Sequence, residues 1–131
     1  MSSVPHRVLV VDDQAPFRAA ARAVLRRLDC FELAGEAASG AEAIELAERI
    51  RPELVLMDIN MPLMSGIAAT REIVSAQPGI VVFLCSTYDT GDLPADAATS
   101  GARAYLTKER LSPDALRRLW DSRDSGVFTA L

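Results

Sequence analysis

The segment Val8-Leu9-Val10-Val11-Asp12-Asp13 places four consecutive apolar residues directly before two carboxylates. A short, unbroken apolar run predicts a strand that is buried on both faces of a parallel sheet. Two later apolar runs also lead into polar residues: Leu54-Val55-Leu56-Met57 into Asp58, and residues 80–85 into Ser86-Thr87. Residues 102–106, predicted as another strand, lead into Thr107-Lys108. We therefore expect a sheet whose strands end in polar side chains.

Helical signals fill the intervals between these runs, and residues 31–37 are predicted as one further strand. Ser39 and Glu42 have the spacing of a capping box, and Ser112-Pro113 supplies an N-cap followed by a proline that suits the first helical position. The expected helices run from Phe17 to Leu28, from Ser39 to before Pro52, from about Ser65 to near Pro78, within residues 88–100, and from Pro113 to Trp120.

Five strands that alternate with five helices predict an α/β fold. We expect a doubly wound, five-stranded parallel sheet of the flavodoxin-like order 2-1-3-4-5, with helices on both faces. The chain is divided into an N-terminal lead-in (residues 1–6), one domain (7–122) and a C-terminal tail (123–131). The tail is polar at first and then apolar, and it is left open whether it frays, packs on the domain or joins a dimer.

Length, charge and the distribution of apolar residues argue against several classes of function. The 131 residues fit one domain, and the net charge of -4 argues against direct binding of nucleic acid, which calls for a basic surface. The start of the chain has no apolar segment typical of a signal peptide, and no apolar run approaches the ~20 residues that cross a bilayer. We expect a cytoplasmic protein with no membrane association, in which Cys30 and Cys85 are reduced thiols.

The polar strand ends predict one site. In the order 2-1-3-4-5 the first and third strands are neighbours, so Asp12, Asp13 and Asp58 converge at the edge where open parallel sheets bind ligands. Three carboxylates repel one another unless a cation lies among them, and magnesium prefers such oxygen ligands. Lys108 and Ser86 are suited to phosphate oxygens. Each residue alone could be an ordinary turn, cap or surface residue, but the ordered set favours a site.

At these residues the sequence resembles the receiver domains of two-component response regulators. The resemblance runs from about Arg7 to Trp120 and includes residues 8–13, 54–62 with Gly66, Ser86-Thr87, Gly101-Ala102 and 105–108. The family often has a proline after the lysine, where this chain has Glu109. The resemblance implies that residues 7–122 are the receiver domain of a phosphorelay.

The resemblance also implies a role for each site residue. Asp58 would be the phosphoryl acceptor, and Mg²⁺, with Mn²⁺ as an alternative, would be the cofactor. The implied metal ligands are Asp12, Asp13, Asp58 and the backbone carbonyl of Asn60. Lys108 and Ser86 would bind the phosphoryl group, Ser86 and Tyr105 would form the switch, and Thr87 is a second candidate for the switch hydroxyl.

The implied partners are a sensor histidine kinase or phosphotransfer protein as donor and a downstream protein as target. We expect a stand-alone regulator, with two alternatives: a receiver fragment of a DNA-binding response regulator, or an interaction module that is not phosphorylated. A homodimer would use the face of the fourth helix, fifth strand and fifth helix. An aspartate-based phosphohydrolase is disfavoured because Asn60 stands where a second aspartate is needed. We therefore expect a signalling phosphoacceptor, with self-phosphorylation and self-dephosphorylation chemistry, rather than an enzyme.

Arg18, Arg22 and Arg26 lie on one face of the first predicted helix. This basic stripe is interpreted either as a solvated helix face or as a contact for an acidic surface of the donor protein.

Overall fold

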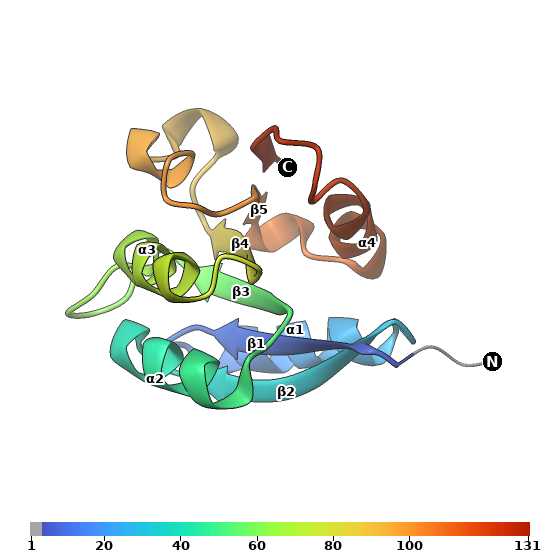
Figure 1. Ribbon diagram of the computed structural model, residues 1–131. Coiled ribbons are helices and arrows are strands. Elements are labelled where there is room, and N and C mark those ends of the chain that lie inside the picture. The colour runs from blue at the N-terminus through green and yellow to red at the C-terminus, as the bar shows by residue number, and fades with distance from the viewer. Residues whose placement is uncertain (1–3) are drawn as a thin grey trace.

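A parallel sheet of six strands forms the centre of the structure, in the order β2-β1-β3-β4-β5-β6 (Figure 1). The computed structural model describes residues 4–131, so residues 1–3 of the expected lead-in lie outside the described residues. In chain order the strands are His6–Val11, Phe31–Ala37, Leu54–Asp58, Val81–Ser86, Ala104–Thr107 and Thr129–Ala130. The predicted flavodoxin-like order 2-1-3-4-5 is confirmed, and a short sixth strand is added at one edge.

Four α-helices cover the two faces of this sheet: α1 (Ala15–Arg26), α2 (Gly40–Ile50), α3 (Gly66–Ala76) and α4 (Pro113–Asp121). Helices α2 and α3 pack on one face, and α1 and α4 pack on the other. Three helices begin at a serine whose Oγ accepts a backbone N–H, which confirms the predicted N-caps at Ser39 and Ser112. Within residues 4–131, no helix has both the length and the apolar character needed to traverse a bilayer.

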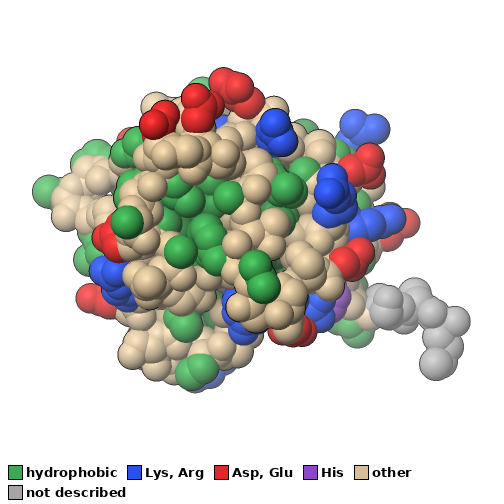
Figure 2. Space-filling model, turned by 90° about the horizontal axis from the view of Figure 1, so that it is seen from above, with side chains coloured by type: hydrophobic (Ala, Val, Ile, Leu, Met, Phe, Trp, Pro, Cys, Tyr) green, Lys and Arg blue, Asp and Glu red, His purple; other side chains and the backbone are tan. Residues whose placement is uncertain are grey.

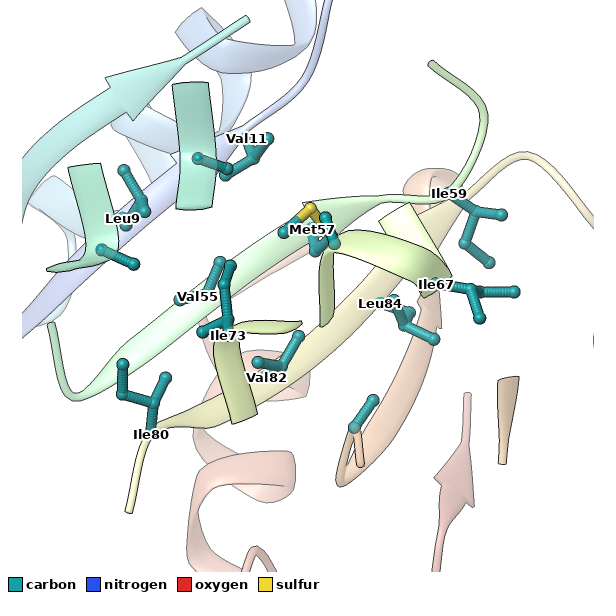
Figure 3. Close-up of a cluster of buried hydrophobic side chains, with 14 of the residues drawn as sticks. Leu9, Val11, Val55, Met57, Ile59, Ile67, Ile73, Ile80, Val82 and Leu84 are labelled. Carbon is teal, nitrogen blue, oxygen red and sulfur yellow. The ribbon is translucent and has the colours of Figure 1, made fainter. Parts of the chain in front are cut away.

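Two apolar clusters explain the unbroken apolar runs. Alternate residues of β3 point to opposite faces, so Val55 and Met57 join the cluster under α2 and α3 (Figure 3). Leu54 and Leu56 join the cluster under α1 and α4. Because both faces of the strand are buried, every position has to be apolar until the strand end is reached.

The prediction of a helix within residues 88–100, the fourth of the five expected helices, is wrong. The segment forms two 3₁₀ turns, η1 (Thr90–Asp92) and η2 (Ala95–Ala97). Gly91 and Pro94 lie within it, and glycine and proline are the two residues that least favour a helix interior. A third turn, η3 (Lys108–Arg110), follows β5.

The C-terminal tail packs on the domain, one of the three alternatives left open above. Its backbone pairs with β5: the Leu131 N–H donates to the Tyr105 carbonyl at 2.9 Å, and the Thr107 N–H donates to the Leu131 carbonyl at 3.0 Å. Phe128 packs against one apolar cluster and Leu131 against the other. Figure 2 looks down on this side of the molecule and shows hydrophobic side chains across its middle, with charged side chains mostly nearer the periphery.

Candidate functional site

Three carboxylates meet at the carboxyl ends of two neighbouring strands. Asp12 and Asp13 follow β1, Asp58 is the last residue of β3, and the pairing of Val11 with Met57 brings the two strand ends together. One oxygen from each carboxylate lies within 4.8 Å of the others. Asp12 and Asp58 are buried, with 0% and 3% of their surface exposed, whereas Asp13 is exposed. The predicted convergence is confirmed.

Lys108 brings a positive charge to these carboxylates from the end of β5. Its Nζ lies 2.7 Å from Asp12 Oδ2 and 3.5 Å from Asp58 Oδ1. The same ammonium lies over the Phe17 ring, 4.7 Å from the ring centroid. Burial by itself would lower the pKa of Lys108, but the hydrogen bond to Asp12 and the attraction of Asp58 together raise it above its ordinary value. The lysine therefore stays charged at neutral pH.

One ammonium does not balance three carboxylates. Burial, followed by repulsion from Asp12, raises the pKa of Asp58 from 3.8 to about 6, against the opposing attraction of Lys108. The Asp58 carboxylate is thus ionised at neutral pH only at an electrostatic cost. A bound divalent cation would remove that cost. The three carboxylates each offer one oxygen at a mutual spacing that can hold such an ion. The triad is able to hold a metal ion.

A small pocket of about 130 Å³ lies over the carboxylates. Its lining comes from the carboxyl ends of four strands, β1, β3, β4 and β5, and the loops that follow them: Asp13, Gln14, Asp58, Asn60, Ser86, Thr87 and Lys108. Both hydroxyl candidates therefore lie at the pocket, but Ser86 ends β4 and is buried, whereas Thr87 is exposed. The Asn60 side chain accepts a hydrogen bond of 3.2 Å from the Tyr88 hydroxyl.

Tyr105 lies behind this pocket and is wholly buried. Its hydroxyl is 3.1 Å from the Ser86 carbonyl and 2.6 Å from the Tyr88 carbonyl, and these two acceptors share its one hydrogen. Burial is the main cause that raises the pKa of Tyr105 to about 12. The tyrosine thus ties the middle of β5 to Ser86 at the end of β4 and to Tyr88 in the loop that follows.

Gly66 allows the start of α3 to lie directly against the end of β3, where Asp58 is found. A Cβ atom on this residue would lie 1.8 Å from the Asp58 carbonyl oxygen, and the Gly66 N–H donates to the Ile59 carbonyl at 2.8 Å. Only glycine allows the start of α3 to approach the Asp58 backbone so closely.

The contact of Arg18 with the backbone of Asp12 was not predicted from the sequence. The Arg18 guanidinium donates to the Asp12 carbonyl at 2.7 Å and lies 3.4 Å from Glu36 on β2. Arg18 and Arg22 are therefore paired, which argues against a purely solvated stripe. A signal was present, since a cation near a helix N-terminus is disfavoured by the helix dipole unless another group holds it.

Comparisons with known proteins agree with this geometry. A family model described as "Response regulator receiver domain" matches residues 8–120. The chain is 42% identical over 103 residues to a protein-glutamate methylesterase/protein-glutamine glutaminase of Alkalilimnicola ehrlichii, covering 78% of this chain and 26% of the relative. It is 42% identical over 107 residues to the transcriptional regulatory protein PdtaR of Mycobacterium tuberculosis, covering 82% and 51%. The chain thus spans from about a quarter to a half of the length of these relatives.

Two solved structures are similar over nearly the whole chain. The response regulator domain of Thermotoga maritima CheB has a TM-score of 0.83 at 27% identity and covers 92% of this chain and 98% of its own. The receiver domain of NarL from Mycobacterium tuberculosis has a TM-score of 0.84 at 28% identity, with 95% and 100% covered.

Proposed function

The chain belongs to the response-regulator receiver family, and from that premise we propose that it accepts a phosphoryl group on Asp58. The observation that carries the proposal is the cluster of Asp12, Asp13 and Asp58 beside Lys108. Asp58 is the buried carboxylate of this cluster whose pKa is raised, chiefly by burial and then by repulsion from Asp12. Such a carboxylate gains most from a bound cation and is suited to act as a nucleophile.

The reaction we propose transfers phosphorus from a phosphohistidine. An Asp58 oxygen forms an O–P bond while the N–P bond of the donor breaks, and the imidazole nitrogen keeps the electron pair and takes up a proton. Phosphoryl transfer of this kind depends on positioning and charge neutralisation rather than on covalent help. The Lys108 ammonium is close enough to Asp58 to pair with an oxygen of the transferred group, and Ser86 supplies a hydroxyl at the pocket wall.

Asp12, Asp13, Asp58 and the backbone carbonyl of Asn60 are the groups that would hold magnesium, or manganese in its place. When bound, the cation would neutralise charge on the phosphoryl oxygens. The oxygen-only donor set supports this proposal, since histidine and thiol ligands are absent from the Asp12–Asp13–Asp58 cluster.

The switch we propose joins Ser86 to Tyr105. The Tyr105 hydroxyl already bonds the backbone of Ser86 and Tyr88, so a movement of Ser86 toward a phosphoryl oxygen would change both of its hydrogen bonds. The response would reach the surface formed by β5, α4 and the 88–100 segment. We propose that a downstream protein, or a second copy of the chain, reads that surface, and that a histidine kinase or phosphotransfer protein is the donor.

The acceptor residue is tested by labelling with acetyl phosphate in the presence of Mg²⁺. Asp58→Asn is expected to abolish the label, because an amide cannot form the acyl phosphate. Asp29→Asn, which changes an exposed aspartate outside the cluster, serves as a control that keeps it. A label that survives in Asp58→Asn would place the acceptor elsewhere and would favour the alternative of an interaction module.

A further inference from the structure

We propose that Arg18 is a positioning residue for the metal site, held in place by Glu36; this inference rests on the proposed function. Arg18 does not face the pocket. It contacts the site through the backbone of Asp12, where one guanidinium nitrogen donates to the carbonyl at 2.7 Å.

The Asp12 carbonyl needs a donor from outside the sheet. Asp12 is fully buried and lies one residue beyond the end of β1. Its N–H still bonds the Ala37 carbonyl of β2 at 3.0 Å, whereas its carbonyl bonds Arg18 of α1. A buried carbonyl without a partner is costly, and a donor that carries a charge makes the stronger bond.

The position of Arg18 is fixed in turn by Glu36. Arg18 Nε lies 3.4 Å from Glu36 Oε1, and Arg22 meets the same carboxylate with Nε at 3.2 Å from Oε2 and Nη2 at 3.3 Å from Oε1. The Arg18 and Glu36 side chains are mostly buried, with 21% and 27% exposed. Glu36 therefore holds both arginines, and α1 is tied to β2 beside the acidic end of β1.

This arrangement fixes two metal ligands at once. The Asp12 carboxylate is also held, because its Oδ1 accepts the Gln14 N–H at 2.8 Å and its Oδ2 meets Lys108. Since Asp13 comes next in the chain, the backbone geometry at Asp12 decides where the exposed Asp13 carboxylate lies. Residues that orient metal ligands in this way commonly change metal affinity by about 10–100-fold when they are removed.

The direction in which metal affinity changes in Arg18→Met distinguishes a positioning role of Arg18 from a purely electrostatic one. Arg18→Met deletes a positive charge near a cation site, so Coulomb's law alone predicts tighter metal binding. Loss of positioning predicts weaker binding. Arg18→Lys keeps the charge but lacks the planar fork that reaches both the Asp12 carbonyl and Glu36, so its affinity should lie between those of the wild type and Arg18→Met.

The experiment is a calorimetric titration of the full chain with Mn²⁺. The dissociation constant should rise about tenfold in Arg18→Met and less in Arg18→Lys. It should stay unchanged in Arg26→Met, which removes an exposed arginine of the same helix. Equal or tighter binding by Arg18→Met overturns the inference. If that variant does not fold, wild-type affinity in Arg18→Lys overturns it instead. A wild-type chain that binds no Mn²⁺ would count against the proposed function itself.

Discussion

The two halves of the chain differ in how firmly their elements are built. Residues 6–76 form three strands of five to seven residues and three helices of eleven or twelve. Residues 81–131 contain one strand of comparable length, the six-residue β4, but their other elements are three turns of three residues, a four-residue β5, a nine-residue α4 and a two-residue β6.

This difference agrees with the roles that we propose for the two halves: the first half holds the metal-binding carboxylates, and the second half holds the residues that respond to phosphorylation. The three carboxylates belong to the first half, at the ends of β1 and β3, whose neighbours in the sheet are strands of five to seven residues. Ser86, Tyr105 and Lys108 belong to the second half. Short elements with few backbone hydrogen bonds open at lower free energy, so a site that joins both halves can keep its chemistry fixed while one side moves.

The largest expected effect on stability comes from a substitution at Gly66, in the first half of the chain. In Gly66→Ala the new methyl group would meet the Asp58 carbonyl at 1.8 Å, so α3 or the end of β3 has to shift. We expect a loss of about 3 kcal/mol of unfolding free energy, measured by urea denaturation. Gly79→Ala is the matched control, since nothing lies within 4 Å of its added Cβ. Equal stability of the two variants would show that the close approach at Gly66 is unimportant.

The next effect comes from removing charge at Asp58. Its folded-state pKa of about 6 lies above the ordinary 3.8, so the folded chain binds more protons than the unfolded chain between these values. Stability should therefore fall as pH rises from about 4 to about 6, and Asp58→Asn should lack this fall. At neutral pH without metal, the variant should be more stable than the wild type by up to about 3 kcal/mol.

Thermal or urea unfolding across this pH range measures the difference, with Asp29→Asn as the control for an exposed aspartate. If wild type and Asp58→Asn show parallel pH profiles, burial at Asp58 does not raise its pKa. Addition of Mg²⁺ should stabilise the wild type more than Asp58→Asn, because a ligand that binds only the folded state adds to its stability.

A smaller effect is expected in the second half, at the tail. Phe128 is half-buried against the cluster that contains Tyr105, so Phe128→Ala should cost about 1 kcal/mol. It should also speed hydrogen exchange at the Thr107 and Leu131 amides, which pair β5 with the tail. Val127→Ala changes the exposed neighbour and should alter neither quantity. Slow exchange in Phe128→Ala would mean that β6 is held by something other than this contact.

The smallest effect on the fold is expected from Ser86→Ala. The Tyr105 hydroxyl bonds the Ser86 backbone, which alanine retains, so the unfolding free energy should change by less than about 0.5 kcal/mol. The variant should still be labelled by acetyl phosphate, but the shift of the Tyr105 ring signals in NMR on labelling should disappear. An unchanged ring response would remove Ser86 from the switch and favour Thr87.

The features that could be predicted from the sequence are those marked by local patterns, and most of them lie in the first half of the chain. The acidic ends of β1 and β3 were predictable because unbroken apolar runs mark both strands and strand order makes them neighbours. The caps at Ser39 and Ser112 were predictable because a cap is a local signal. The Gly66 contact is local as well, but its closeness appears only when the start of α3 is placed against β3.

Other features depend on distant partners. A two-residue strand such as β6 has no periodicity, and its pairing requires the free edge of β5. A helix was expected in the 88–100 segment because Pro94 suits a first helical turn and Gly101 a C-terminal cap, but the six residues between them form only one 3₁₀ turn, η2. Arg18 and Glu36 lie on different elements, so no pattern within one segment relates them.

The most direct test of the whole account is a crystal structure of the chain grown with Mn²⁺, read through the anomalous scattering of the metal. We predict one strong peak in contact with carboxylate oxygens of Asp13 and Asp58 and with the backbone carbonyl of Asn60, with the Asp12 carboxylate bound to the metal through a water molecule. A peak elsewhere on the molecule, or a cluster that keeps Lys108 as its sole cation at saturating Mn²⁺, would contradict the claim that these strand ends share a divalent ion.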